Sequence, residues 1–224
     1  MKNILNYEII IYPNMNRLTK TAVIEAIIKA SEEKQFDPCT MITLAHIETG
    51  GTFNNLAQNG KYLGVFQMSD GYGGVKGNDR LDPYKAAIGT IKSISTFKDK
   101  VEKAGITWQP FYIYLRHQQG EAGAFWLIED AANGKKIKEH YNRVTKDSRG
   151  SVLLKNAKKA WNLTLESKVS EWLNHWGSNF NSIYGKCEYK CPVSGLASAC
   201  AIIYDGQAFT ANINYFMKKR NYYL

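Results

Sequence analysis

Apolar residues recur at a helical spacing near the start of the chain. Between Arg17 and Lys34, apolar side chains three and four positions apart form one stripe, and charged residues lie mostly opposite. This pattern predicts an amphipathic helix over those residues. The stripe consists of Leu18, Val23, Ile24, Ile27 and Ile28. Upstream, residues 8–12 are expected to form a short extended segment, ended by a Pro-Asn pair.

A second helix is bounded by residues that favour helix ends. Asp37 suits the N-cap position, and Pro38 suits the first helical position, where its missing N–H costs nothing. The pair Gly50-Gly51 tolerates the left-handed conformation that commonly ends a helix. We therefore expect a helix from Pro38 to Thr49.

The middle of the chain combines a long irregular stretch with further helices. The Gly- and Asn-rich segment from Thr52 to Arg80 is too long for a simple connector, and loops of this length are usually functional. The apolar spacing then predicts helices over 83–101, 108–119, 122–132 and 151–176, with Gly120 separating the second from the third.

From Lys186 onward the sequence changes character. It contains three of the four cysteines, then alternates and is rich in Tyr, and it carries a basic run near its end. The expected fold class is mainly α, with a small irregular or β-containing extension at the C-terminus. We expect a helical domain over 1–185 and an extension of unknown role over 186–224.

Composition limits the class of protein and of partner. A chain of 224 residues with 44% hydrophobic and 22% charged residues fits one ordinary globular domain. The net charge of +9 points to an anionic partner such as nucleic acid, an acidic lipid surface or a bacterial envelope. No helix-turn-helix, RNP or zinc-finger signature accompanies the charge, so no nucleic-acid partner is expected. An aromatic content of 12% is compatible with a carbohydrate site.

The four cysteines do not predict a metal site. Cys187, Cys191 and Cys200 have the spacing C-x3-C-x8-C with no His between them, which is unlike a zinc site. Neither metal nor cofactor is expected. Together with Cys39, these residues are expected to be free or opportunistically paired thiols, the default in a reducing compartment. The first 16 residues are too polar for a signal peptide, and no apolar stretch approaches a membrane span.

One carboxylate occupies a position where the pattern predicts a core residue. Met41, Leu44, Ala45 and Glu48 share one face of the second helix, so Glu48 ends an apolar stripe. Partial desolvation there would raise its pKa above the reference value of about 4.3, as a general acid requires. The alternative is an ordinary helix-end Glu whose carboxylate bends back to solvent.

Three short blocks surround this glutamate in the sequence. They read ETGG at 48–51, GVFQMS at 64–69 and YLRHQQG at 114–120. In this order the blocks resemble the signatures of the soluble lytic transglycosylase and goose-type lysozyme superfamily, over roughly residues 35–185. The third block is similar to that of phage-encoded transglycosylases, both endolysins and tail-associated enzymes. The resemblance implies a lysozyme-like helical fold and cleavage of peptidoglycan.

The resemblance also implies a site. Glu48 is expected to be the catalytic acid, with no second carboxylate required. In the second block a glycine permits close backbone approach, a Phe offers an apolar wall and a Gln offers a two-way amide; an ordinary turn with one buried Phe is the alternative. In the third block a Tyr and a His share a helix face, and a core Tyr with a surface His is the alternative. The expected substrate-binding residues are Thr49, Gly64, Phe66, Gln67, Tyr114, His117 and Gln118.

The sequence departs from the family pattern twice. Thr49 stands where the family has Ser, which retains a hydroxyl. His117 begins a His-Gln-Gln-Gly run in place of Tyr-Asn-Ala-Gly, so the aromatic hydroxyl normally near the acid is missing there. Tyr114, one helical turn earlier, is the candidate to supply it.

Other carboxylates offer a hydrolytic alternative. Asp82 before Pro83 is expected to cap a helix, Asp79 beside Arg80 to form a solvated pair, and Glu121 to cap the helix after Gly120. Any of these, or Asp70, would serve a true lysozyme that activates water. A non-catalytic virion or wall-binding protein is a second alternative, and a nucleic-acid-binding module, which rests only on the net charge, is a third.

The implied partners are peptidoglycan glycan strands, together with other phage particle proteins if the enzyme is carried in the virion. We expect synthesis in the host cytoplasm without a signal peptide. Action on periplasmic or cell-wall peptidoglycan would follow, after release at lysis or delivery by the particle.

Overall fold

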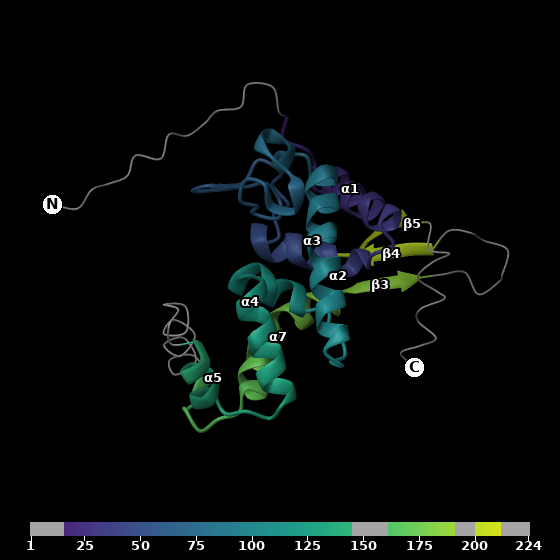
Figure 1. Cartoon of the computed structure of the whole chain (residues 1–224). Coiled ribbons are helices and arrows are strands. Elements are labelled where there is room, and N and C mark those ends of the chain that lie inside the picture. The colour runs from purple at the N-terminus through teal and green to yellow at the C-terminus, as the bar shows by residue number, and fades with distance from the viewer. Residues whose placement is uncertain (1–15, 145–160, 191–199, 212–224) are drawn as a thin grey trace. The chain divides into compact units, whose positions relative to one another are not determined.

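The computed structural model describes residues 16–144, 161–190 and 200–211 (Figure 1). These residues are mainly helical, with a small antiparallel sheet near the C-terminus. The coarse fold class expected from the sequence is therefore confirmed. The extended segment expected at 8–12 lies outside the described residues. No helix in the described ranges is both long and apolar enough to cross a membrane.

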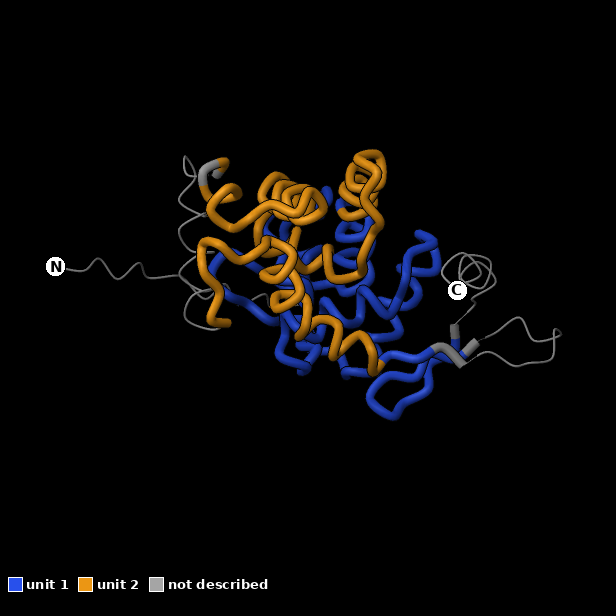
Figure 2. The backbone as a smooth tube through the Cα atoms, turned by 90° about the horizontal axis from the view of Figure 1, so that it is seen from below, with its two compact units in different colours: residues 1–93, 187–224 blue, residues 94–186 orange. Residues whose placement is uncertain are grey.

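The backbone groups into two compact units, coloured separately in Figure 2. Unit 1 combines residues 1–93 with residues 187–224, and unit 2 consists of residues 94–186. The C-terminal strands thus belong with the N-terminal helices. This grouping describes packing, and the expected division into domains 1–185 and 186–224 stays a prediction.

Unit 1 begins with helix α1 (Lys20–Glu33). The Thr19 side chain caps it by accepting a hydrogen bond from the Ala22 N–H at 3.2 Å. The expected apolar stripe is buried from Val23 to Ile28, whereas Leu18 precedes the helix and is 39% exposed. The prediction of a helix is confirmed, with a start three residues later than expected.

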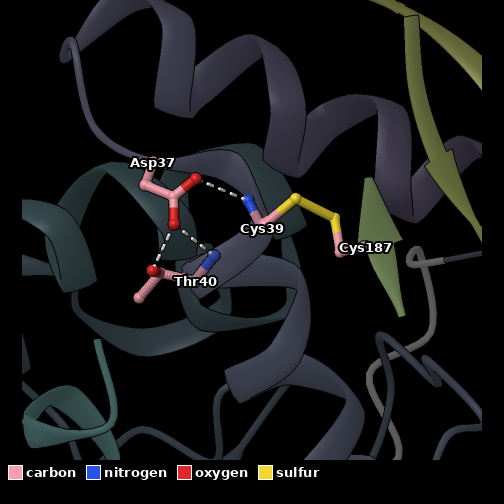
Figure 3. Close-up of a disulfide and its surroundings, with 4 residues drawn as sticks. All are labelled: Asp37, Cys39, Thr40 and Cys187. Atoms are coloured by element: carbon pink, nitrogen blue, oxygen red, sulfur yellow. Dashed lines mark hydrogen bonds between the residues drawn. A yellow bond between two sulfur atoms is a disulfide. The ribbon is translucent and has the colours of Figure 1, made fainter. Parts of the chain in front are cut away.

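Helix α2 (Pro38–Thr49) packs against α1 and has the predicted ends. The Asp37 carboxylate accepts hydrogen bonds from the N–H groups of Cys39 at 3.2 Å and Thr40 at 3.0 Å (Figure 3). Gly50 has φ 58° and ψ 32°, the left-handed conformation that ends the helix. Both boundaries are confirmed.

The long segment after α2 is irregular, as predicted. It contains a two-residue antiparallel ladder of β1 (Gln58–Asn59) and β2 (Tyr62–Leu63). Two 3-10 turns follow, η1 (Tyr72–Gly74) and η2 (Gly77–Leu81). Helix α3 (Pro83–Lys103) then begins in unit 1, and the boundary between the units falls within it.

The C-terminal sheet consists of β3 (Cys187–Lys190), β4 (Cys200–Tyr204) and β5 (Gln207–Ala211), antiparallel in that order. The pair Asp205-Gly206 joins β4 to β5 with positive φ at both residues, as a two-residue hairpin turn requires. Strand β5 contacts α1. The expected β-containing extension is confirmed.

A disulfide joins the C-terminal sheet to α2. Cys39 in the first turn of the helix is bonded to Cys187 at the start of β3 (Figure 3). Of the two states expected for the cysteines, free or opportunistically paired, the structure shows the paired one for these two residues. Pairs so distant in sequence are not recognisable from spacing, because only the folded chain brings their Cβ atoms together.

Unit 2 packs α4 (Tyr112–Ala132) against α7 (Val169–Tyr184), with α5 (Ile137–Val144) beside α4. Gly120 interrupts α4 with φ 69° and ψ 171°, as predicted. The first part of α4 starts at Tyr112 rather than at the expected position 108.

The continuous helix expected over 151–176 is wrong, although residues 169–176 are helical as part of α7. Residues 162–168 form no helix, and Asn162 has a positive φ of 54°. The N–H of Ile137 instead donates to the Ser167 carbonyl at 2.9 Å, and the backbones of Lys136 and Lys168 form an isolated antiparallel β-bridge. These tertiary hydrogen bonds hold the segment in a non-helical conformation, although its apolar periodicity predicted a continuous helix. Residues 145–160 lie outside the described ranges.

Candidate functional site

Glu48 occupies the last turn of α2. Every residue from Pro38 to Ala45 in that helix is buried, and Glu48 itself is half-buried. The helix thus begins in the core of unit 1, and Glu48 lies at its partly exposed end. This position, between full burial and full exposure, is the one the apolar stripe predicted.

Thr49 uses its hydroxyl to finish the same turn. Its Oγ1 donates to the Ala45 carbonyl at 2.7 Å and accepts from the Phe53 N–H at 3.0 Å. The hydroxyl is therefore engaged by the protein's own backbone. Its local role is to shape the turn after Glu48, and its role in binding substrate stays a prediction.

The second block folds into a tight loop around Gly64. Gly64 has φ 77°, and a Cβ there would lie 1.9 Å from the Arg80 carbonyl oxygen. Close backbone approach is confirmed, but the approaching group is the protein's own chain. Phe66 is fully buried, so its ring is a core side chain and not an exposed apolar wall. The expected contact of Phe66 with substrate stays a prediction.

Gln67 closes this loop from within. It has a positive φ of 45°, and its Nε2 donates to the carbonyls of Gly64 at 2.8 Å and Ala57 at 3.3 Å. Both amide protons thus hold the loop, and Oε1 is the atom of this half-buried side chain that remains for a ligand.

Arg80 anchors the loop from the other side, a role that the sequence reasoning missed. The residue is 8% exposed, and its guanidinium donates to the carbonyls of Gly77 at 2.9 Å, Lys61 at 3.0 Å and Met68 at 3.2 Å. An arginine directly after Asp79 looked like half of a solvated ion pair. Only the fold shows that it points inward.

The three aspartates of the loop have structural partners. Asp82 caps α3 by accepting from the N–H groups of Tyr84 at 2.9 Å and Lys85 at 3.1 Å, as predicted. Asp79 pairs with Lys85 Nζ at 2.7 Å and not with its neighbour Arg80. Asp70 accepts from the Gly77 N–H at 2.8 Å. Each of these carboxylates therefore already stabilises local structure.

The third block lies in unit 2. The Tyr114 ring stacks with Trp176 at a centroid distance of 5.5 Å and with Phe180 at 6.5 Å. Tyr114 thus belongs to an aromatic cluster between α4 and α7, which fits the core alternative for its ring. Its hydroxyl remains the candidate polar group.

His117 and Gln118 differ in environment. His117 is half-buried, and its pKa is lowered to about 4 by desolvation and by the neighbouring Arg116 charge. The ring is therefore neutral at pH 7 and is not the surface His of the alternative reading. Gln118 is exposed. Beyond the Gly120 break, Glu121 lies 3.5 Å from Lys100 Nζ and 3.6 Å from the Arg116 guanidinium.

A buried ionic cluster in unit 2 also escaped sequence reasoning. Asp130 has no exposed side-chain surface, and its carboxylate contacts Lys135 Nζ and His140 Nδ1 at 2.7 Å and Arg143 NH1 at 2.8 Å. Burial alone would raise the pKa of Asp130, but the hydrogen bonds from these three residues outweigh it and lower the pKa. Burial lowers the pKa of His140. The cluster ties α5 to the end of α4.

The predicted site residues fall into the two units. Unit 1 holds Glu48, Thr49, Gly64, Phe66 and Gln67, and unit 2 holds Tyr114, His117 and Gln118. Across the described part of the chain, no group of three His, Cys, Asp or Glu side chains is arranged to hold a metal ion. Comparison with protein-family models, with curated proteins and with solved structures gave no match.

Proposed function

We propose that this protein is a peptidoglycan lytic transglycosylase with a lysozyme-like fold and that Glu48 is its catalytic acid. The observation that carries the proposal is the placement of Glu48: a half-buried carboxylate in the last turn of a helix whose preceding residues are buried. Partial desolvation favours the protonated form of a carboxyl group, which a general acid needs. The order of the three sequence blocks supplies the substrate class.

The proposed reaction needs one carboxyl group. Glu48 donates its proton to the oxygen that bridges N-acetylmuramic acid and N-acetylglucosamine, and the bond from the muramic C1 to that oxygen breaks. The muramoyl N-acetyl group stabilises the cationic C1. The Glu48 carboxylate then takes the proton of the 6-hydroxyl of the same sugar, whose oxygen bonds to C1. The products are a 1,6-anhydromuramoyl end and a free 4-hydroxyl, and no water is consumed.

The partners of the loop aspartates support this reaction over hydrolysis. A hydrolytic lysozyme would use a second carboxylate to activate water. Each loop aspartate either accepts a hydrogen bond from a backbone N–H, as Asp70 and Asp82 do, or pairs with a lysine, as Asp79 does. These aspartates therefore already have structural roles, which favours a mechanism that uses Glu48 alone.

Mass spectrometry of a peptidoglycan digest tests the proposal. We expect muropeptides that are lighter by one water than reducing ends, because the muramic acid closes on itself. Reducing ends would show the hydrolytic alternative, and an undigested wall would favour the non-catalytic one.

A matched pair of variants assigns the chemistry to Glu48. Glu48→Gln is expected to abolish release of muropeptides while leaving the circular dichroism spectrum and the sedimentation with purified walls unchanged. Glu25→Gln, an exposed change on α1, is the control and should retain wild-type activity. Near-normal activity of the Glu48 variant would remove this residue from the mechanism.

We also propose that the protein acts outside the host cytoplasm, as a phage enzyme freed at lysis or carried in the particle. The Cys39–Cys187 disulfide supports this location, because disulfides persist in oxidising compartments. The net charge of +9 would favour association with an anionic wall.

A further inference from the structure

The C-terminal hairpin brings a buried tyrosine to α2. Tyr204, the last residue of β4, is 3% exposed. Its hydroxyl lies 2.5 Å from His46 Nδ1 in a hydrogen bond. Its ring meets His46 edge-on at a centroid distance of 6.2 Å and Phe53 at 5.9 Å. Tyr204 therefore contacts both the end of α2 and the loop that follows it.

The contact lies at the turn that carries Glu48. The His46 carbonyl accepts a hydrogen bond from the Gly51 N–H at 2.7 Å, which closes the helix around Glu48. The His46 ring packs close to Gly51, since a Cβ there would lie 3.0 Å from His46 Cε1. Any displacement of His46 would thus be transmitted to the backbone on both sides of Glu48.

The hairpin is held in place independently of Tyr204. Lys20 of α1 pairs with Asp205 in the hairpin turn at 2.5 Å, and its Nζ lies 5.5 Å from the Phe53 ring centroid. At the start of the sheet, β3 is bonded to α2 through the Cys39–Cys187 disulfide. The hairpin therefore presents Tyr204 as a fixed partner to His46.

From these contacts, and resting on the proposed function, we propose that Tyr204 is a positioning residue that fixes the Glu48 turn through His46. The C-terminal strands then form part of the site without touching substrate. The role differs from general packing, because it depends on one hydroxyl that bonds to a residue two positions before the acid.

The hydroxyl keeps its proton over the working range of pH. Burial and the neighbouring Asp205 charge raise the pKa of Tyr204 to about 12. The hydroxyl can therefore donate to His46 Nδ1 when His46 carries its own proton on Nε2. A donating hydroxyl requires the Nε2-protonated tautomer of His46, and nitrogen NMR of the imidazole distinguishes this tautomer from the Nδ1-protonated form.

The test is Tyr204→Phe, which removes only the hydroxyl, with Tyr141→Phe on α5 as a matched control. We expect amide hydrogen exchange at Gly51 to accelerate about tenfold and the His46 nitrogen shifts to change, since one buried hydrogen bond corresponds to roughly that factor. On a defined soluble glycan fragment, kcat should fall about tenfold with little change in KM, because a misplaced acid slows the chemical step. Tyr141→Phe should change none of these.

Two outcomes would overturn the proposal: unchanged Gly51 exchange in Tyr204→Phe, or a raised KM at constant kcat. If Tyr204→Phe fails to fold, His46→Gln in the wild-type background provides the second test, with the same exchange and kinetic readouts. If the wild-type protein does not cleave peptidoglycan, the proposed function fails, and Gly51 exchange alone decides whether Tyr204 holds the turn.

Discussion

Gly64 lies so close to Arg80 that a Cβ on the glycine would be 1.9 Å from the arginine's carbonyl oxygen. The contact joins the second sequence block to the residue that anchors the loop between α2 and α3. The glycine is therefore required twice, for its positive φ and for the space that a side chain would fill.

Gly64→Ala tests this contact against Gly60→Ala. Both glycines have positive φ, but a Cβ on Gly60 would meet nothing within 4 Å. We expect Gly64→Ala to lower the free energy of unfolding by about 2 kcal/mol more than Gly60→Ala, because only Gly64→Ala adds a backbone clash. Denaturant unfolding measures the difference, and equal losses would show that the loop relaxes around the new methyl group.

Removal of the disulfide should destabilise the protein. Cys39 and Cys187 are 148 residues apart, and cross-linking so long a loop restricts the unfolded chain. We expect the double variant Cys39→Ala/Cys187→Ala to lose about 3–5 kcal/mol of unfolding free energy relative to the oxidised wild type. Unfolding in oxidising buffer measures this loss. An unfolding free energy equal to that of the wild type would contradict the stabilising role of the disulfide.

His117 should make stability depend on pH. Its pKa is about 4 in the folded protein against an ordinary value of 6.5, so between these values the unfolded chain binds a proton that the folded chain does not. The free energy of unfolding should therefore fall as the pH drops from about 6.5 toward 4. His117→Gln should flatten this decline, and NMR titration should place the His117 midpoint near 4. His140 acts in the same direction but is present in both proteins, so the difference isolates His117.

The Asp130 cluster should be needed for the stability of unit 2. Asp130→Asn removes a fully buried charge that accepts hydrogen bonds from the partly exposed Lys135 and Arg143 and from the buried His140. We expect a loss of about 1–3 kcal/mol, the usual cost of disrupting hydrogen bonds to a buried polar group. Asp99→Asn, at an exposed position of α3, is the control. Thermal unfolding followed by circular dichroism measures the difference. Equal melting temperatures of the two variants would contradict this role of Asp130.

The ends of several helices could be predicted from the sequence, because they are decided by residues within one turn. Asp37, Pro38 and Gly50 each act within one helical turn, so their residue types alone fixed the ends of α2. The same holds for Asp82 at the start of α3 and for the break at Gly120.

Features that depend on a partner far away in the sequence could not be predicted. The apolar spacing continues through Leu165, but backbone hydrogen bonds to the start of α5 override it. A Phe in a Gly-containing loop has the same sequence signal whether it lines a groove or fills the core, so the full burial of Phe66 could not be predicted from its motif. The pairing of Cys39 with Cys187 and of His46 with Tyr204 depends on residues separated by most of the chain.

The composition of unit 1 from both ends of the chain has a consequence for biosynthesis. Ribosomes release the N-terminal helices first, and all of residues 94–186 must be made before β3 appears. During that interval α1 has no strand β5 to contact, Cys39 waits for its bonding partner, and the ring of His46 lacks its tyrosine. Nascent chains should therefore acquire the complete Glu48 turn only after the β4–β5 hairpin has been translated, so this turn matures later than the helix that carries it.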